Sequence, residues 1–189
     1  MINYTPRLDE AMRVAAMAHS EQTRKGTDIP YIVHPFAVMY IVSQATNDED
    51  VLIASLFHDI IEDVPDKYSK EQMQRAFGAR VVRIVEGVTK DDTIEDWQGR
   101  ADAYLDHLRT ADIESVMVSG ADKIHNLQSI LLDYERYGEE LWTRFNAGKE
   151  SQLWWYESIL EVLQERIPES PLTETLDNLT AKLKPLVLV

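Results

Sequence analysis

The sequence contains no cysteine, which excludes disulfide bonds, zinc–thiolate sites and thiol-based catalysis. It also lacks any apolar run of about 18 residues, the length that a membrane-spanning helix needs. The N-terminus has no charged segment followed by an apolar one, the pattern of a secretory signal. We therefore expect a cytoplasmic protein with no membrane partner.

Positive charge is scarce, because 19 Lys and Arg residues stand against 33 Asp and Glu residues and leave a net charge of -14 at pH 7. A nucleic-acid-binding surface needs clustered Lys and Arg to neutralise phosphates. Nucleic acid is therefore excluded as a partner. A small phosphorylated substrate needs only a local basic spot, and a metal ion serves the same purpose.

Strand-like alternation of apolar and polar residues is absent, and apolar residues instead recur at helical spacing. We expect an all-α fold of about eight to ten helices, organised as one domain over residues 1–189. Gly, Pro and capping residues divide the chain, and residues 24–30 and 91–99 are expected to be loops. Ser69 and Gln72 have the spacing of a capping box, which is expected to open a short helix that ends at Gly78. The expected helices cover about residues 8–18, 35–42, 48–63, 70–77, 79–90, 100–110, 113–137, 142–163 and 171–189.

A cluster of titratable side chains lies at the C-terminal end of the apolar helix expected over residues 48–63, before Pro65. The pair His58-Asp59 comes before Glu62-Asp63, and helical residues four apart share a face, so His58 would lie over Glu62 and Asp59 over Asp63. Burying this charge is costly unless it is compensated. A divalent cation would compensate it, and imidazole with carboxylate suits Mn, Fe, Co or Zn. The alternative is a helix end whose acids simply face water.

Two further positions have chemical potential and a structural alternative. Asp122 stands on an apolar helix face and shares one side with His125 and Asn126, which is compatible with a ligand site. Its alternative role is a structural pairing with Lys123 or with a neighbouring helix. His34 precedes a proline suited to a first helical turn, and its alternative role is that of a hydrogen-bonded structural histidine.

Four motifs, in order, resemble the hydrolase domain of the RelA/SpoT proteins and still more the stand-alone small alarmone hydrolases, the Mesh-like proteins. They read QTRKGTDIPYIVHP, LFHDIIED, VEGVTK and ADKIHN, at residues 22–35, 56–63, 85–90 and 121–126. The arrangement of His34, His58-Asp59 and Asp122 also resembles the signature of the wider HD-domain metal-dependent phosphohydrolases. The resemblance covers roughly residues 10–165 and leaves the C-terminal helix, 171–189, as an addition.

The resemblance implies an HD-domain helical fold and an Mn²⁺-dependent hydrolase that removes the 3′-pyrophosphate of guanosine tetra- and pentaphosphate. It implies four ligands for one Mn²⁺: His34, His58, Asp59 and Asp122. It implies two carboxylates that orient or activate the attacking water: Glu62 and Asp63. It implies four substrate-binding positions: Arg24, Lys25, Asn126 and Ser129.

Two other functions remain open from the sequence. One is an HD phosphohydrolase for another nucleotide, such as a nucleoside monophosphate or the 2′-phosphate of NADPH. The other is a non-enzymatic, metal-stabilised regulatory domain, which has no need of the second acidic pair, Glu62-Asp63. The apolar C-terminal tail, Leu186 to Val189, is expected to pack on the domain or on a second copy of the chain in a homodimer.

Overall fold

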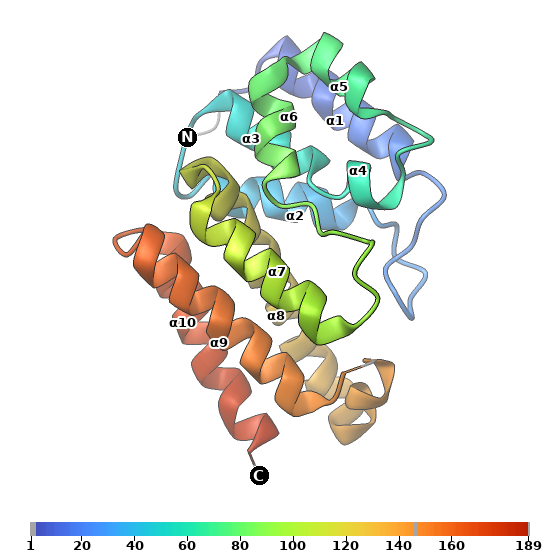
Figure 1. Cartoon of the computed structure of the whole chain (residues 1–189). Coiled ribbons are helices and arrows are strands. Elements are labelled where there is room, and N and C mark those ends of the chain that lie inside the picture. The colour runs from blue at the N-terminus through green and yellow to red at the C-terminus, as the bar shows by residue number, and fades with distance from the viewer. Residues whose placement is uncertain (1–2, 146, 189) are drawn as a thin grey trace.

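The computed structural model describes residues 3–145 and 147–188. In these residues every regular element is helical, apart from one isolated antiparallel bridge between Thr23 and Pro30, and the all-α prediction is confirmed. The α-helices in Figure 1 are α1 (Pro6–Ala18), α2 (Val33–Val42), α3 (Glu49–Phe57), α4 (Ile60–Asp63), α5 (Lys70–Phe77), α6 (Ala79–Glu86), α7 (Trp97–Thr110), α8 (Ile113–Tyr137), α9 (Lys149–Arg166) and α10 (Pro171–Val187), with a 3-10 helix η1 (Gly138–Arg144).

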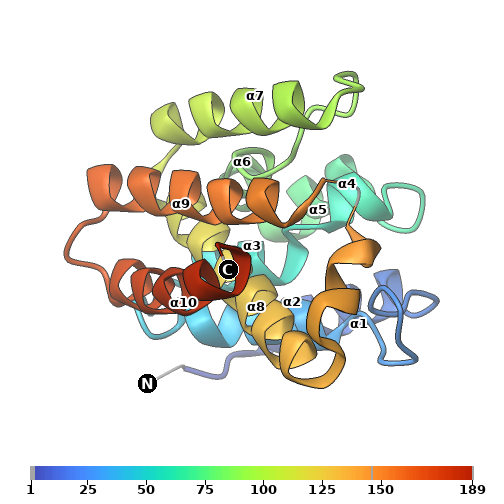
Figure 2. The ribbon, with the colours of Figure 1, turned by 90° about the horizontal axis from the view of Figure 1, so that it is seen from below.

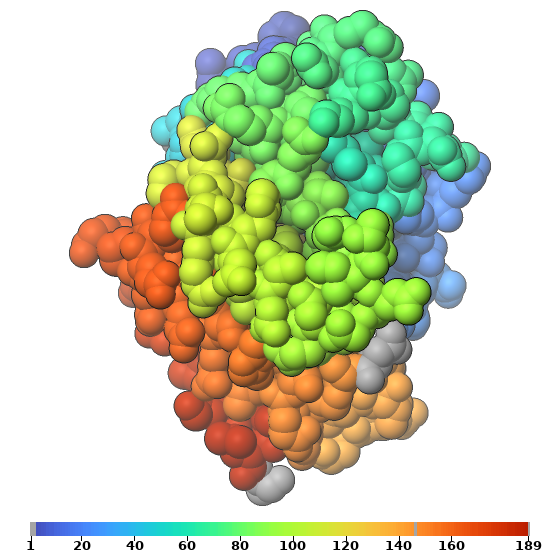
Figure 3. All heavy atoms as spheres, viewed as in Figure 1, coloured from blue at the N-terminus to red at the C-terminus, as the bar shows by residue number. Residues whose placement is uncertain are grey.

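Helices α3 and α8 form the centre of the molecule. The residues of α3 from Val51 to Phe57 are all buried, as expected for a helix that is apolar on every side. It packs against α1, α2, α6 and α8. The long helix α8 also packs against α2, α9, α10 and η1, so it joins the two halves of the chain. With all atoms drawn, α5, α6 and α7 form much of the surface on the viewer's side (Figure 3).

The expected helix over residues 48–63 is interrupted at the chemically important point. Helix α3 ends at Phe57, residues 58 and 59 form a turn, and α4 begins at Ile60. The backbone N–H of Asp63 donates to the carbonyl of Asp59 at 2.8 Å, so the chain returns to helical geometry directly after the turn. Consecutive side chains of a continuous helix do not face each other. The turn lets the side chains of His58 and Asp59 meet, with Nε2 and Oδ2 3.0 Å apart.

Local signals set most of the other boundaries. The expected capping box at Ser69 and Gln72 is present, and Gly78 separates α5 from α6 with a φ of 92°. Helix α7 begins at Trp97, before the expected Arg100, because Asp96 acts as its N-cap and accepts from the N–H of Gly99. The segment from residue 142, expected to start a helix, belongs instead to η1, and α9 begins at Lys149.

The C-terminal helix α10 lies beside α9 in both ribbon views and also packs against α8 (Figures 1 and 2). It buries Leu172, Leu176, Leu183 and Val187 in the hydrophobic core. Of the apolar tail, Val187 is buried and Leu188 is exposed, whereas Val189 lies outside the described residues. Pairing with a second copy therefore stays a prediction. Within the described residues, no helix combines the length and apolar character needed to cross a membrane.

Candidate metal centre and adjoining cavity

The four residues predicted as metal ligands converge from three parts of the chain. His34 comes from the first turn of α2, His58 and Asp59 from the turn after α3, and Asp122 from the middle of α8. The Nε2 atoms of His34 and His58 are 3.2 Å apart. The Nε2 of His34 is also 3.1 Å from Asp122 Oδ1 and 3.5 Å from Asp59 Oδ2. His34, His58 and Asp122 are buried, and Asp59 is partly buried.

These separations fit a shared divalent ion. Two perpendicular bonds of about 2.1 Å place their donor atoms about 3 Å apart. One ligand atom from each of His34, His58 and Asp59 lies within 4.8 Å of the other two. Asp122 Oδ1 is 3.8 Å from His58 Nε2 and offers a further oxygen donor beside this group. Two imidazoles with carboxylates form a donor set that suits Mn, Fe, Co or Zn.

The outward-facing nitrogen of each histidine is already occupied. His58 Nδ1 donates to the carbonyl of Ser55 at 2.8 Å, which leaves the lone pair of Nε2 facing the centre. His34 Nδ1 lies 2.8 Å from His125 Nδ1. Lone pairs of two imidazoles and two carboxylates thus meet at one buried place, an arrangement that needs a cation or protons for compensation.

The charges of this centre shift the pKa values of its members when no ion is bound. Burial acts to lower the pKa of His58, but the carboxylates of Asp59 and Asp122 outweigh it and raise that pKa to about 9. Burial acts to raise the pKa of Asp122, yet the Lys123 ammonium and the nearby histidines hold it well below its ordinary value. The centre therefore holds a proton on His58 at neutral pH.

Binding of a divalent ion is expected to release that proton. Because the pKa of His58 is raised to about 9, the ion must displace a proton at any lower pH. We expect about one proton released per Mn²⁺ at pH 7, and an affinity that strengthens up to about tenfold per pH unit until the pH reaches about 9. Titration calorimetry in two buffers of different ionisation enthalpy counts these protons. An affinity that stays constant from pH 7 to pH 9 would contradict this expectation.

Asp122 forms the ion pair with Lys123 that the sequence offered as an alternative, and it also faces the candidate metal centre. Its Oδ2 is hydrogen-bonded to the buried ammonium of Lys123, while its Oδ1 faces the histidines. Asn126 Nδ2 also donates to Oδ1, at 2.5 Å. The Lys123 ammonium lies 5.4 Å from the ring centroid of Tyr104, a cation–π distance that helps to hold a charge out of water. The ion pair therefore orients the carboxylate and leaves one oxygen for the centre.

The second acidic pair lies next to the centre with two different environments. Glu62 accepts from the ammonium and from the backbone N–H of Lys90, both at 3.2 Å. Partial desolvation and the negative charges of Asp59 and Glu62 raise the pKa of Asp63, although this residue still reaches solvent. A raised pKa makes a carboxylate a stronger base while it stays ionised. Asp63 thus has the chemical properties of a proton acceptor.

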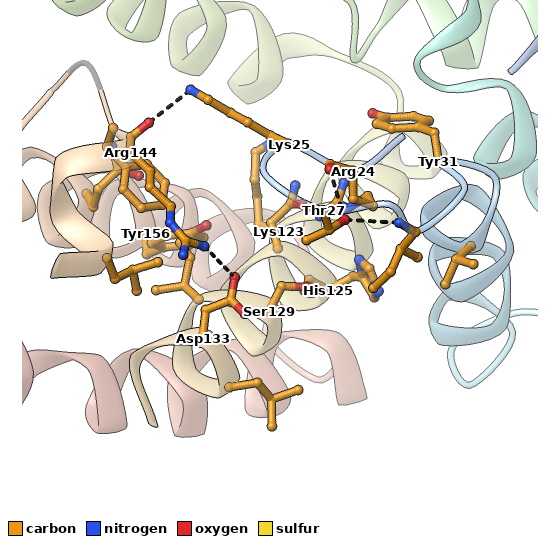
Figure 4. A pocket seen from close by; sticks show the side chains of 18 of the residues that line it. Arg24, Lys25, Thr27, Tyr31, Lys123, His125, Ser129, Asp133, Arg144 and Tyr156 are labelled. Carbon is orange, nitrogen blue, oxygen red and sulfur yellow. Dashed lines mark hydrogen bonds and ion pairs between the residues drawn. The ribbon is translucent and has the colours of Figure 1, made fainter. Parts of the chain in front are cut away.

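A cavity of about 590 Å³ opens beside the centre, between residues 24–33, α8, η1 and α9 (Figure 4). All four predicted substrate-binding residues line it: Arg24, Lys25, Asn126 and Ser129. The Arg24 guanidinium donates to Asn126 Oδ1 at 3.0 Å and lies 5.6 Å from the ring centroid of Tyr31. Lys25 reaches the carbonyl of Arg144, at 2.9 Å, and the Ser129 hydroxyl donates to a backbone carbonyl of its own helix, at 3.0 Å.

The lining of this cavity is basic although the protein is acidic. Among the described residues it includes six basic side chains, namely Arg24, Lys25, Lys90, Lys123, Arg136 and Arg144, and one acidic side chain, Asp133. A concave surface of one charge sign concentrates ligands of the opposite sign. The cavity is therefore suited to an anionic ligand with several charges.

Several functional contacts were not visible in the sequence. Tyr31 donates to Asp59 Oδ2 at 2.6 Å, Lys90 binds Glu62, and His125 contacts His34. The motifs contain all three of these residues, Tyr31, Lys90 and His125, but only the folded structure shows which side chains they contact. A second hollow of about 390 Å³, lined by Glu62, shares Lys90, Gln152 and Trp155 with the basic cavity. Glu62 therefore faces a second hollow that adjoins the basic cavity.

The sequence matches the family described as HD domain over residues 11–151. It is 38% identical over 123 residues to a guanosine-3′,5′-bis(diphosphate) 3′-pyrophosphohydrolase of Haemophilus influenzae, which covers 62% of this chain and 18% of the relative. It is 36% identical over 130 residues to the bifunctional (p)ppGpp synthase/hydrolase SpoT of Escherichia coli K12, which covers 66% of this chain and 18% of the relative. The chain therefore matches less than a fifth of the length of these relatives.

Two solved structures share the fold. One is a metazoan ortholog of SpoT, which is described as hydrolysing ppGpp and playing a role in starvation responses. It superposes with a TM-score of 0.80 at 24% sequence identity, and the match covers 96% of this chain and 98% of that one. A protein of Listeria monocytogenes EGD-e superposes with a TM-score of 0.70 at 26% identity, over 79% of this chain and 97% of that one. The sequence relatives confirm the resemblance to RelA/SpoT hydrolases that the four motifs indicated, and the solved structures confirm the fold.

Proposed function

The chain belongs to the HD-domain family, and we propose that it is an Mn²⁺-dependent hydrolase that removes the 3′-pyrophosphate of guanosine tetra- and pentaphosphate. One observation carries the proposal: a centre of two histidines and two aspartates adjoins a cavity lined by six basic side chains in a chain of net charge -14. The names of the relatives supply the substrate class.

The centre has the parts needed to transfer a phosphoryl group to water. A divalent ion held by His34, His58, Asp59 and Asp122 would polarise a phosphoryl oxygen and lower the pKa of a water molecule. Asp63, next to Glu62, would take the proton of the attacking water, and its raised pKa supports this role. The water oxygen forms a bond to the phosphorus that is attached to the ribose 3′-oxygen. The bond between this phosphorus and the 3′-oxygen breaks, the 3′-oxygen takes a proton, and pyrophosphate leaves.

The cavity provides for the rest of the substrate. Tyr31, Lys123, His125 and Asn126 each line the cavity and each contact a member of the centre. A ligand in the cavity can therefore present one phosphate to the centre while its other charges lie against the basic lining. Guanosine 3′,5′-bis(diphosphate) carries a diphosphate at each end of the ribose, and this distribution of charge matches the two parts of the site.

A substrate panel tests the proposal directly. With Mn²⁺ present, the purified protein should release pyrophosphate, and no orthophosphate, from guanosine 3′,5′-bis(diphosphate). The same assay with a nucleoside monophosphate and with NADPH covers the other nucleotide substrates, and replacement of Mn²⁺ by Mg²⁺, Co²⁺ or Zn²⁺ tests the choice of ion. Orthophosphate release from NADPH or the monophosphate, with no turnover of the bis(diphosphate), would contradict the proposed substrate.

Arg24→Ala is expected to raise KM for the bis(diphosphate) by about tenfold or more, the effect of losing a charge-assisted hydrogen bond. Asn126 and Tyr31 hold the guanidinium at the cavity wall, where it can bind a phosphate in both the ground state and the transition state, so kcat should change little. The effect should be much smaller for a monophosphate, which has no distal phosphate.

Steady-state kinetics of wild type and variant on both substrates measure this difference. Arg13→Ala is the matched control, because Arg13 is an exposed arginine on α1 that pairs with Asp9. An equal change in KM for the two substrates would mean that Arg24 does not hold a distal phosphate.

A further inference from the structure

His125 occupies a position between the metal centre and the basic cavity. We propose that its Nδ1 holds His34 in the orientation for metal binding while its Nε2 donates a hydrogen bond to an anionic oxygen of the substrate in the cavity. His125 would then be a positioning residue for the ion and a binding residue for the substrate. The substrate half of this inference rests on the proposed function, whereas the metal half does not.

The two ligand histidines are oriented in different ways. His58 Nδ1 donates to the backbone carbonyl of Ser55, three residues earlier in the same segment. His34 instead depends on a side chain that is 91 residues away in sequence, at 2.8 Å from Nδ1 to Nδ1, with the ring centroids 4.9 Å apart. A ligating histidine usually gives its other N–H to a carboxylate, a carbonyl or water. Here the partner of His34 is a second imidazole, that of His125, whose Nε2 is not used in this contact.

The hydrogen-bond chemistry assigns the protons of this pair. His34 Nε2 is directed at the centre and needs its lone pair there, so the ring proton of His34 is on Nδ1. His34 Nδ1–H must then donate, and His125 Nδ1 must accept. An imidazole that accepts at Nδ1 carries its own proton on Nε2. The tautomer of His125 is therefore determined by the ligand role of His34.

The remaining N–H of His125 is available to a ligand in the cavity. The ring lines the cavity and is partly exposed, and Figure 4 shows it among the side chains of the lining. Nδ1 is engaged by His34, and Nε2 is not among the buried polar atoms without a partner, so we infer that Nε2 is the atom that a bound anion reaches. The next residue, Asn126, binds both Arg24 and Asp122, which places His125 at the end of the cavity nearest the centre.

Two substitutions separate the two roles. In His125→Asn, the amide oxygen can take the place of Nδ1 and accept from His34, but nothing replaces Nε2. In His125→Leu, both hydrogen bonds are lost. The matched control is His107→Asn, because His107 is an exposed histidine on α7.

The first measurement is Mn²⁺ affinity, by competition with a fluorescent chelator in the absence of nucleotide. His125→Leu should bind Mn²⁺ about 10- to 100-fold more weakly than wild type, the usual cost of losing an outer-shell partner. His125→Asn should stay within about threefold of wild type, because His34 keeps its acceptor. Thermal unfolding of the ion-free proteins checks that both variants are folded.

The second measurement is steady-state hydrolysis of guanosine 3′,5′-bis(diphosphate) at saturating Mn²⁺. Both variants should show KM raised by about tenfold, because both lack the donor in the cavity, and His125→Asn should keep a kcat near that of wild type. A merely structural role would not separate metal affinity from KM in this way.

Each half of the inference has its own contrary result. Wild-type Mn²⁺ affinity in His125→Leu would overturn the positioning of His34. A wild-type KM in His125→Asn would overturn the donor role of Nε2. If the wild type binds Mn²⁺ and the affinities follow the expected order, but no bis(diphosphate) is hydrolysed, then the proposed function fails and the metal half stands.

Discussion

Alanine at His58 or Asp59 is expected to remove the divalent ion and to lower kcat for the bis(diphosphate) by about 10³-fold or more. Each substitution deletes one of the three ligand atoms of His34, His58 and Asp59 that lie within 4.8 Å of one another. An ion that stabilises phosphoryl charge contributes several kcal/mol, and each 1.36 kcal/mol is about tenfold in rate. Wild-type protein should hold about one ion per chain after dialysis, by elemental analysis.

The ion content of the variants decides this assignment without any substrate. Full occupancy in both His58→Ala and Asp59→Ala would mean that the ion is bound elsewhere. His107→Ala, an exposed histidine on α7, serves as the control for loss of an imidazole. Circular dichroism of the ion-free proteins separates loss of the ion from loss of the fold.

Glu62→Gln and Asp63→Asn are expected to retain the ion and to slow kcat by about 10²-fold or more, the usual scale for a positioned acid–base group. Asp63 has a raised pKa, which suits it to receive a proton, and asparagine cannot do so. Glutamine at position 62 keeps an oxygen that can accept from Lys90, so the local contacts survive while the negative charge is lost.

The acidic pair is tested by comparing kcat with ion content in the same samples. Asp66→Asn is the matched control, since Asp66 is an exposed aspartate a few residues further along the chain. Unchanged kcat in both variants of the pair would remove Glu62 and Asp63 from the mechanism. A loss of ion together with kcat would instead place them among the groups that hold the centre.

The secondary structure was predictable wherever the signal was local. The capping box at Ser69 and the end of α8 at Gly138 both appear in the structure, because each depends on backbone groups within a few residues. The exceptions also have local causes that are harder to recognise. Asp96 caps α7 four residues before the predicted first residue, Arg100, so the helix begins at Trp97. No Gly or Pro marks the turn at residues 58–59.

The candidate site was predictable as a set of residues, because motif order and residue chemistry are properties of the sequence. The resemblance of the motifs to RelA/SpoT and HD-domain hydrolases indicated His34, His58, Asp59 and Asp122 as a group, and the structure brings them together. It also indicated Arg24, Lys25, Asn126 and Ser129, and all four line one cavity. Their roles as ligands and substrate contacts stay predictions, to be tested by the variants above.

Only the tertiary structure decided which side chains assist these residues. The basic side chains of the lining come from residues 24–25, residue 90, α8 and η1, so their gathering is invisible in a chain whose net charge is -14. The contacts of Tyr31 with Asp59 and of His125 with His34 join positions 28 and 91 residues apart. Helical periodicity and caps are determined by neighbours in sequence, whereas tautomers, shifted pKa values and cavities arise from groups that meet only when the helices pack.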